Sequence, residues 1–427
     1  MTDHQPSRRS FIGHSALAAA SAATLSAATR SYAAAGDDTL RVGLIGCGGR
    51  GSGAAVNALN ADSRTKLVAV GDAFADSAQN CVNRLKAQGG IGDRVVVEPD
   101  HIFSGLEAYK HVTDMCDVVL LCTPPHFRPM QIEYAVEKGK HIFAEKPVAT
   151  DPAGIRRVLA ACEKAKQKSL AVVSGLCYRY HYAKRATIDR IHDGAIGDIT
   201  SLSTYYHTGG LWHRGRQDDW TEMEYQVRNW LYFTWLSGDF ITEQHVHSLD
   251  KTAWIMGDTP PLRATAMGGR AVRTDPKYGN AYDQFYTTFE YADGIQLHSS
   301  CRQWVNCASR VTDHAYGTKG EANIMGHSIS GENEWRWRNP EGLVDDMYQN
   351  EHNELFASIR ANEPINNGEY MSHSSMMAIM ARMSAYTGQV VTWEQAMNSK
   401  LDLSPERYDW DSAPDIQLAV PGVTQFV

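Results

Sequence analysis

The sequence predicts an α/β fold with two domains: an N-terminal doubly wound parallel sheet and a C-terminal α+β domain with an open, mostly antiparallel sheet. Two observations predict this fold. Apolar runs of strand length alternate with helical patterns up to about residue 178, which favours a parallel sheet with helices on both faces. Beyond that point the apolar residues alternate with polar ones, as in half-buried antiparallel strands.

The length and composition agree with a two-domain globular protein. The chain has 427 residues, and its 43% of apolar residues suffice for ordinary cores. The formal net charge of −8 gives no sign of a nucleic-acid or membrane-surface partner. We expect one domain over 36–178 and a second domain, for substrate binding and oligomerisation, over 179–427.

Residues 1–35 are typical of an export signal. The stretch Ser7-Arg8-Arg9-Ser10-Phe11-Ile12 resembles the twin-arginine motif, and an Ala/Ser-rich segment and small residues suited to cleavage follow it. An alanine-rich amphipathic helix with two chance arginines is the alternative. The signal predicts a periplasmic or otherwise exported protein without a membrane anchor after processing. Because the twin-arginine route carries folded proteins, a cofactor could be loaded before export.

A glycine-rich turn follows the first expected strand. The strand ends at Gly46-x-Gly48-x-x-Gly51, and small apolar residues then continue with helical spacing, which is the pattern of a dinucleotide-binding turn. Gly46 would make the tight turn, Gly48 would let the backbone approach a pyrophosphate, and Gly51 would let the helix pack close to the strand. Gly49 and Arg50 lie within the turn, where Arg50 would contact the pyrophosphate or lie in solvent.

A carboxylate at the end of the second strand indicates which nucleotide would bind. Asp72 follows the glycine turn at about the spacing at which an acid binds the ribose hydroxyls of the adenosine. A carboxylate there would repel a 2′-phosphate, so NAD is expected rather than NADP. A solvated aspartate at a strand end is the alternative.

The remaining elements follow in order along the chain. In the first domain the pattern predicts a short strand over 94–97, strands over 117–122, 140–144 and 169–174, and a helix over 151–166 capped by Asp151. In the second domain it predicts strands over 198–206, 285–291 and 295–298, and helices over 350–361 and 372–386.

These motifs together resemble the Gfo/Idh/MocA family of oxidoreductases. The glycine turn, Asp72, Thr123-Pro124-Pro125-His126 and Glu145-Lys146-Pro147 stand in the family's order and spacing, and the resemblance covers nearly all of the chain after the signal. It implies a Rossmann domain followed by a substrate domain. The residues that it and the motifs place at the cofactor are Gly46, Gly48, Gly49, Arg50, Gly51, Asp72, Thr123, Pro124, His126, Glu145 and Lys146.

The candidate catalytic residues lie in two segments. Oxidation of an alcohol requires a base for the hydroxyl proton, and Lys146 at the carboxyl edge of the sheet suits this role; a surface lysine paired with Glu145 is the alternative. The resemblance implies a second segment with catalytic residues. In this segment Glu243 replaces the family's usual aspartate, and His247 serves as acid/base. If this segment is helical, Glu243 and His247 share a face, and Asp250 would steady the imidazole.

A metal site is an opposing interpretation of the same segment. In an extended strand, Glu243, His245 and His247 would alternate onto one face and offer mixed nitrogen and oxygen ligands. The helix that the resemblance implies disfavours this arrangement and would point His245 elsewhere, so no metal is expected.

Substrate-binding residues are expected from two further features. Arg179, just beyond the last strand of the first domain, would hold a substrate hydroxyl or carboxylate, or would bridge the two domains. Five of the ten tryptophans lie between residues 212 and 254 among basic residues, a composition that suits sugar rings or a subunit interface. Trp212 and Arg228 are the candidates from this cluster.

The resemblance and the export signal together imply a sugar or cyclic-polyol oxidoreductase whose NAD stays bound and is recycled within the site. A homo-oligomer of two or four subunits is expected. Free NAD is scarce outside the cytoplasm, so a released NADH would have no partner for reoxidation. Two alternatives stay open. One is a redox-neutral glycosidase or lyase that oxidises C3, eliminates and then reduces the ketone again. The other is a non-catalytic sugar-binding protein.

Overall fold

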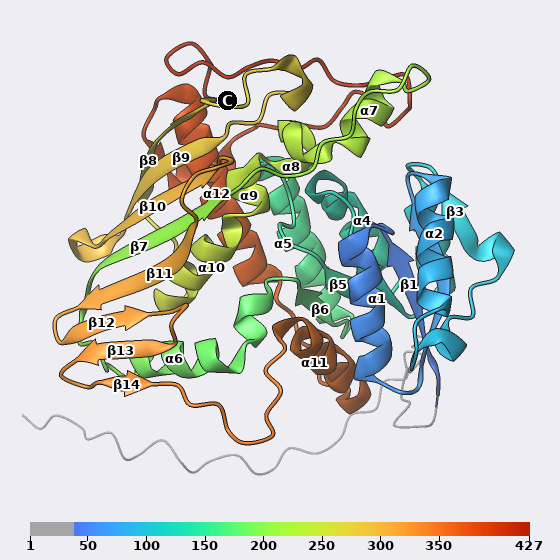
Figure 1. Cartoon of the computed structure of the whole chain (residues 1–427), viewed down its shortest axis with the longest axis horizontal. Helices are drawn as coiled ribbons and strands as arrows, with labels where there is room; N and C mark the ends of the chain where they lie inside the picture. Colours follow the sequence, from blue (N-terminus) through green and yellow to red (C-terminus); the bar gives the residue numbers. More distant parts are fainter. Residues whose placement is uncertain (1–37) are drawn as a thin grey trace, which may run out of the picture. The chain divides into compact units, whose positions relative to one another are not determined.

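The computed structural model describes residues 38–427, and the predicted export signal over 1–35 lies outside the described residues. Two β-sheets organise the described chain (Figure 1). The first has six strands and the second has nine. Among residues 38–427 no helix has both the length and the apolar character that crossing a bilayer requires.

The first sheet is wholly parallel, with the strand order β3-β2-β1-β4-β5-β6, as expected of a Rossmann domain. Its strands are β1 (Leu40–Ile45), β2 (Thr65–Asp72), β3 (Ile102–Ser104), β4 (Val118–Leu121), β5 (His141–Ala144) and β6 (Val172–Ser174). The helices between them are α1 (Gly49–Ala61), α2 (Ala75–Lys86), α3 (Ala108–Met115), α4 (Arg128–Glu137) and α5 (Pro152–Gln167). The predicted cap of α5 is confirmed, because the Asp151 carboxylate accepts a hydrogen bond from the Gly154 amide at 2.7 Å.

The third strand lies later in the chain than predicted. Residues 94–97 do not form a strand: Val95 makes a single bridge to Leu67, and a turn of helix that begins at Pro99 separates this stretch from β3. Val95 and Val97 are nevertheless buried. Their apolar character therefore reflects packing against the sheet rather than membership of it.

The second sheet is mixed and mostly antiparallel, with the order β14-β13-β12-β11-β7-β10-β9-β8-β15. Among the described strands of this second sheet, only β7 and β10 pair in parallel. The strands are β7 (Ile199–Thr208), β8 (Arg263–Gly269), β9 (Gln284–Glu290), β10 (Gln296–Gln303), β11 (Arg310–Gly317), β12 (Gly320–Asn323), β13 (Ser328–Gly331), β14 (Trp335–Arg336) and β15 (Val391–Thr392). Strands β9 and β10 form an antiparallel hairpin, in whose connection Asp293 and Gly294 both have positive φ.

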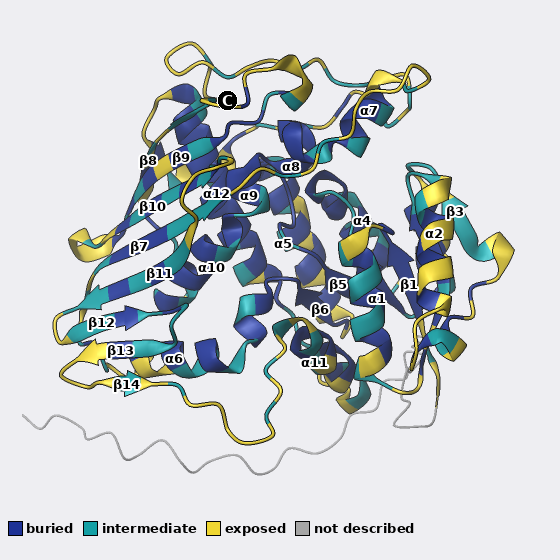
Figure 2. Cartoon of the chain, in the orientation of Figure 1, coloured by how far each residue is buried: buried dark blue, intermediate teal, exposed yellow. Residues whose placement is uncertain are grey.

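Helices of the second domain join this sheet to the first domain. They are α6 (Tyr182–His192), α7 (Glu222–Arg228), α8 (Thr234–Ser237), α9 (Phe240–Glu243), α10 (Val246–Ile255), α11 (Met347–Ala361), α12 (Gly368–Thr387) and α13 (Trp393–Asn398). The long helix α12 contacts α5 of the first domain as well as α10 and β8 of the second. Most of its residues are buried, as the dark blue ribbon in Figure 2 shows, so one apolar core continues across both domains.

Helix α11 returns to the first domain although it follows the second sheet in the chain. It packs on α1, and its residues Leu355 and Phe356 belong to the apolar core beneath the glycine turn. Just after α11 the chain pairs with β6: the Val172 amide donates to the Ile365 carbonyl at 2.8 Å, and the Asn367 amide donates to the Val172 carbonyl at 2.9 Å. A boundary at residue 178 thus separates the two sheets, but the first domain also contains residues 347–367.

Leu355→Ala should lower the free energy of unfolding by about 2–5 kcal/mol, because it empties a fully buried site in the first domain's core. Asn353→Ala, on the exposed face of the same helix, should change it by less than about 0.5 kcal/mol. Urea unfolding followed by circular dichroism measures both. Equal effects of the two substitutions would contradict the packing of α11 in this core.

Candidate active site

The glycine turn lies between β1 and α1, and its glycines face different surroundings. Gly46 has a φ of +91°, and its amide donates to the Gly71 carbonyl at 2.8 Å. A Cβ on Gly51 would lie 1.8 Å from the Gly46 carbonyl oxygen, whereas a Cβ on Gly48 or Gly49 would meet no protein atom within 4 Å. The tight turn at Gly46 and the close packing at Gly51 agree with the predicted roles. The open space beside Gly48 leaves its backbone accessible to a ligand.

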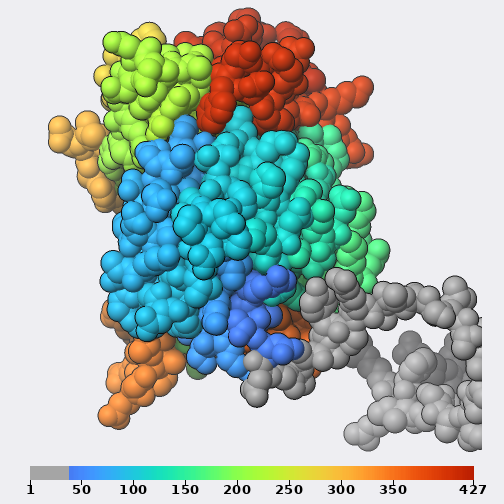
Figure 3. Space-filling model, turned by 90° about the vertical axis from the view of Figure 1, so that its right-hand side faces the viewer, coloured from blue at the N-terminus to red at the C-terminus, as the bar shows by residue number. Residues whose placement is uncertain are grey.

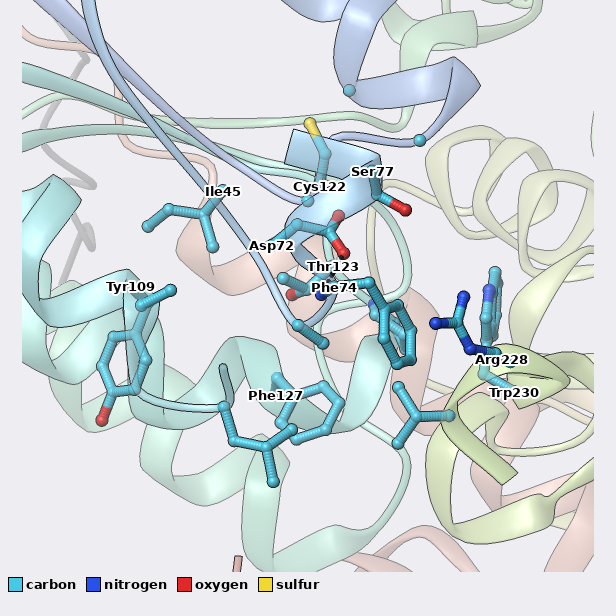
Figure 4. A pocket seen from close by; sticks show the side chains of 18 of the residues that line it. Ile45, Asp72, Phe74, Ser77, Tyr109, Cys122, Thr123, Phe127, Arg228 and Trp230 are labelled. Atoms are coloured by element: carbon cyan, nitrogen blue, oxygen red, sulfur yellow. Dashed lines mark hydrogen bonds between the residues drawn. The ribbon is translucent and has the colours of Figure 1, made fainter. Parts of the chain in front are cut away.

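A cavity of about 450 Å³ lies at this turn, at the carboxyl ends of β1, β2 and β4 (Figure 4). Ligands of open α/β sheets bind at this position, where the strand order reverses. Of the predicted cofactor residues, the cavity is lined by Gly46, Gly48, Gly49, Arg50, Gly51, Asp72, Thr123 and Pro124. Aromatic side chains that the motifs did not single out, Phe74, Tyr109, Phe127 and Trp230, line it as well.

Asp72 is held at the end of β2 by backbone amides. One carboxylate oxygen accepts from the Cys47 amide at 2.7 Å and the other accepts from the Phe74 amide at 3.0 Å. Burial raises the pKa of this carboxyl, and the two amide donors oppose that rise. Each oxygen has a second lone pair, so Asp72 can still accept hydrogen bonds from a ribose.

Thr123 and Pro124 reach the cavity, but His126 does not, contrary to the prediction. The imidazole of His126 is buried beside the Tyr408 hydroxyl, 2.8 Å from its Nε2, and burial lowers its pKa to about 4. Phe127 lines the cavity instead. The short helical turn after Pro124 rotates the histidine into the protein interior.

Arg128 positions both loops that carry predicted site residues, and the sequence motifs did not indicate it. Its guanidinium is buried and donates to the Thr123 carbonyl and to the Pro147 carbonyl, each at 2.5 Å. Arg128 thereby joins the end of β4 to the end of β5. Its neighbours in the sequence carry no signal that would distinguish it from a surface arginine at the start of a helix.

Arg50 lines the cavity, but its guanidinium is paired with two buried carboxylates. It forms ion pairs with Glu145 and with Glu351 of α11, the latter at 2.6 Å. Burial opposes the charge of Arg50, yet the two carboxylates outweigh this effect and raise its pKa. Glu145, predicted at the cofactor, is therefore a buried partner of the glycine turn, and Glu351 is a site residue that the sequence did not reveal.

Lys146 and Glu243, both candidate catalytic residues, form an ion pair with each other, whereas the sequence predicted that Glu243 would orient His247. The Lys146 ammonium donates to the Glu243 carboxylate at 3.1 Å and to the Glu243 carbonyl at 2.5 Å, and each side chain is 15% exposed. Lys146 follows β5 at the carboxyl edge of the sheet, and Glu243 is the last residue of α9. The alternative pairing of Lys146 with Glu145 is not formed, because Arg50 pairs with Glu145 instead.

The segment around His247 differs from the expected single helix. Helix α9 ends at Glu243 and α10 begins at Val246, so the Glu243 carboxylate faces Lys146 rather than His247. Asp250 does not steady the imidazole either. Its carboxylate accepts from Arg179 and from Ser374, each at 2.9 Å.

The imidazole of His247 meets the ring of Tyr178 edge-on, with the ring centroids 5.2 Å apart. Its buried Nδ1 has no hydrogen-bond partner among the described residues. Burial, with the charges of Lys146, Lys251 and Arg50, lowers the pKa of His247 well below its usual value. A neutral imidazole that can accept a proton is therefore the stable form at neutral pH.

His245 points away from this site, as predicted. Its Nε2 lies 2.6 Å from the Ser299 hydroxyl on β10, and burial lowers its pKa to about 3. The alternative metal site required an extended strand, but Glu243 ends α9, His245 lies between the two helices and His247 belongs to α10. Among residues 38–427 no group of three histidine, cysteine or carboxylate side chains is arranged to hold a metal ion.

All three predicted substrate residues have surroundings other than those predicted. Arg179 bridges elements rather than facing a cavity: it pairs with Asp250 and Asp258, and its guanidinium lies 3.9 Å from the Tyr370 ring centroid. Trp212 and Arg228 line the nucleotide cavity, and the Arg228 guanidinium lies over the Phe74 ring, two residues beyond Asp72. Arg228 therefore lies near the expected position of the adenosine, not of the substrate.

Comparison with known proteins identifies two matching domains. Residues 40–173 match the oxidoreductase family with an NAD-binding Rossmann fold, GFO_IDH_MocA, and residues 185–323 match the GFO/IDH/MocA C-terminal domain.

Relatives with described activities match over different lengths. A 2,7-anhydro-N-acetylneuraminate hydratase of Escherichia coli is 25% identical over 42% of this chain, which spans only 44% of that protein. An inositol 2-dehydrogenase of Rhizobium meliloti is 28% identical over 66% of this chain and 74% of its own length. The aldose-aldose oxidoreductase structure from Caulobacter crescentus has a TM-score of 0.62 and 18% identity, covering 83% of this chain and 99% of that one. At 18% identity, the similarity to the aldose-aldose oxidoreductase structure concerns the fold alone.

Gly48→Ala should leave the free energy of unfolding of the nucleotide-free protein within about 0.5 kcal/mol of the original, because the added methyl group meets only open space. It should weaken NAD binding by about tenfold or more, since the backbone can no longer approach a pyrophosphate. Gly51→Ala should instead destabilise the protein by about 1–3 kcal/mol, because its methyl group collides with the Gly46 carbonyl. Thermal unfolding and calorimetric titration with NAD separate these effects; a destabilised Gly48→Ala protein would refute the assignment.

Proposed function

Because the chain belongs to the Gfo/Idh/MocA oxidoreductase family, we propose that it transfers a hydride between bound NAD and a sugar or cyclic polyol. The observation that carries the proposal is the cluster of Lys146, Glu243 and neutral His247 at the carboxyl edge of the NAD-binding sheet. The relative named inositol 2-dehydrogenase, which matches over both domains, supports a polyol or sugar as substrate.

The nucleotide site fits NAD by its own chemistry. The open backbone at Gly48 and Gly49 and the N-terminus of α1 suit a pyrophosphate, and Asp72 suits the ribose hydroxyls. Asp72 also favours NAD over NADP, because its carboxylate would repel a 2′-phosphate. When bound, NAD supplies the acceptor for the hydride.

Lys146 and His247 divide the proton chemistry in the proposed reaction. As hydride leaves the alcohol carbon, the hydroxyl proton must leave too, and the neutral imidazole of His247 can accept it. The ammonium of Lys146, held by the Glu243 carboxylate, can donate a hydrogen bond to the same oxygen as negative charge develops there. Glu243 is in this account a positioning residue for Lys146.

Export by the twin-arginine route remains part of the proposal, with NAD recycled within the site through a second substrate. The support is the sequence of residues 1–35, which resembles such a signal. A homo-oligomer of two or four subunits is proposed with it. The intact mass of protein purified from the periplasm would show whether the segment over residues 1–35 has been removed. Light scattering would give the number of subunits.

A redox-neutral elimination is the second candidate, and the relative named a hydratase favours it. Transient oxidation at C3 would acidify the C2 proton, which a base would remove before the glycosidic oxygen leaves. Burial raises the pKa of the nearby Tyr178 to about 12, so its hydroxyl stays protonated at neutral pH, and of these two groups only the His247 imidazole is free to accept the proton. The same site could therefore serve both reactions.

Lys146→Met should lower kcat for sugar or polyol oxidation by about 10²–10⁴-fold, because the hydrogen bond to the reacting oxygen is lost. NAD affinity should stay within a factor of about three, since Lys146 does not line the nucleotide cavity. The matched control is Lys166→Met, an exposed lysine paired with Glu163. Steady-state kinetics and calorimetry measure both quantities; full activity of Lys146→Met would support a non-catalytic binding protein.

Purified protein incubated with aryl glycosides and no added NAD distinguishes the two reactions. We expect that no phenol is released. When a polyol is added, we expect the bound NAD to be reduced, which an increase in absorbance at 340 nm would show. Release of phenol without net NADH would instead establish the redox-neutral elimination.

A further inference from the structure

A segment of the second domain forms one wall of the nucleotide cavity. We refer to residues 212–230 as the adenosine cap; they comprise an irregular stretch, α7, and the start of a short helical turn over Trp230–Tyr232. Figure 3 shows this yellow-green segment lying against the blue first domain. The cap side chains that line the cavity are Trp212, Arg214, Val227, Arg228 and Trp230.

The contacts of the cap are concentrated at the end of β2. The Arg228 guanidinium lies 3.7 Å from the Phe74 ring centroid and 3.9 Å from the Asp76 carboxylate, while Glu224 accepts from its Nε at 2.8 Å (Figure 4). The Arg228 side chain is only 13% exposed. Phe74 lies two residues beyond Asp72, so these contacts are formed beside the carboxylate expected to bind the adenosine ribose.

Internal hydrogen bonds fasten the cap. The Asn229 side chain accepts from the Arg214 amide at 2.8 Å and donates to the Arg214 carbonyl at 3.1 Å. The Tyr232 hydroxyl donates to the Leu211 and Trp212 carbonyls at 3.2 and 2.9 Å. Beneath them, buried apolar residues of the cap pack together with Phe127, Phe74 and Leu106 of the first domain. The wall is thus anchored in a core that both domains share.

We propose that the adenosine cap encloses the adenosine half of NAD and makes the dinucleotide a retained group rather than an exchanging cosubstrate. The inference rests on the proposed function, because it requires NAD in this cavity. On this side Trp230 and Arg228 offer the adenine a planar aromatic and a planar guanidinium surface (Figure 4), and Trp212 lines the same cavity. Release of the adenosine requires breaking contacts with a segment that is itself held in place.

The exchange of bound NAD tests the proposal. Full-length protein loaded with radiolabelled NAD is chased with excess unlabelled NAD, and the label left on the protein is counted after rapid desalting. The double variant Trp212→Ala/Arg228→Met should release NAD about tenfold faster or more, as expected for lost stacking on a base. The matched control is Arg216→Ala, a cap arginine paired with the exposed Glu222 and absent from the cavity wall, which should exchange at the original rate.

Binding of the two halves of the cofactor separates a local effect from general destabilisation. ADP-ribose carries the adenosine half, and nicotinamide mononucleotide carries only the other half. The double variant should bind ADP-ribose about tenfold more weakly and nicotinamide mononucleotide with unchanged affinity by calorimetry. Trp212→Ala alone, at a site 44% exposed, provides a variant whose folding is not at risk and should show a smaller change in the same direction.

Three results would overturn the proposal. Equal exchange rates in the original protein and the double variant would refute the cap while leaving the oxidoreductase function in place. Equal weakening of ADP-ribose and nicotinamide mononucleotide would indicate a general structural effect. Failure of the original protein to bind NAD at all would refute both the cap and the proposed function.

Discussion

The buried ion cluster of Arg50, Glu145 and Glu351 joins the parts on which the candidate site depends. Arg50 belongs to the glycine turn, Glu145 precedes Lys146 at the end of β5, and Glu351 lies on α11, 301 residues beyond Arg50. Both carboxylates are almost fully buried, and a buried carboxylate without a partner is strongly unfavourable. Arg50 therefore fixes the turn that would bind the nucleotide relative to the strand end that carries the lysine.

The sequence predicts those parts of the fold and site that depend on local pattern. The alternation of strands and helices, the glycine turn and the position of Asp72 follow from spacing or from the family motif, and the first domain has the strand order expected of a Rossmann domain. Each of these features is encoded within a short stretch. Local steric demands, such as that of Gly51 against the Gly46 carbonyl, leave a recognisable trace in the sequence.

The features that the sequence does not predict depend on contacts between distant residues. The residues next to Glu351 and Arg128 in the sequence do not distinguish them from charged residues on the surface of a helix. Only their tertiary contacts give them their roles. His126 is directed inward by a turn whose orientation depends on Tyr408, far along the chain. The sequence does not predict the break between α9 and α10 either. The break falls at Gln244, and neither a glycine nor a proline marks it.

The return of the chain to the first domain restricts how the two halves of the protein can move. The polypeptide passes from the Rossmann sheet to the second sheet near residue 178, comes back through α11, and crosses again into α12 after pairing with β6. Three covalent connections leave little freedom for a hinge, since rotation about one linker is opposed by the other two. In the proposed function a substrate would therefore meet a site whose parts keep their spacing, and selectivity would depend on the shape of a preformed site rather than on domain closure.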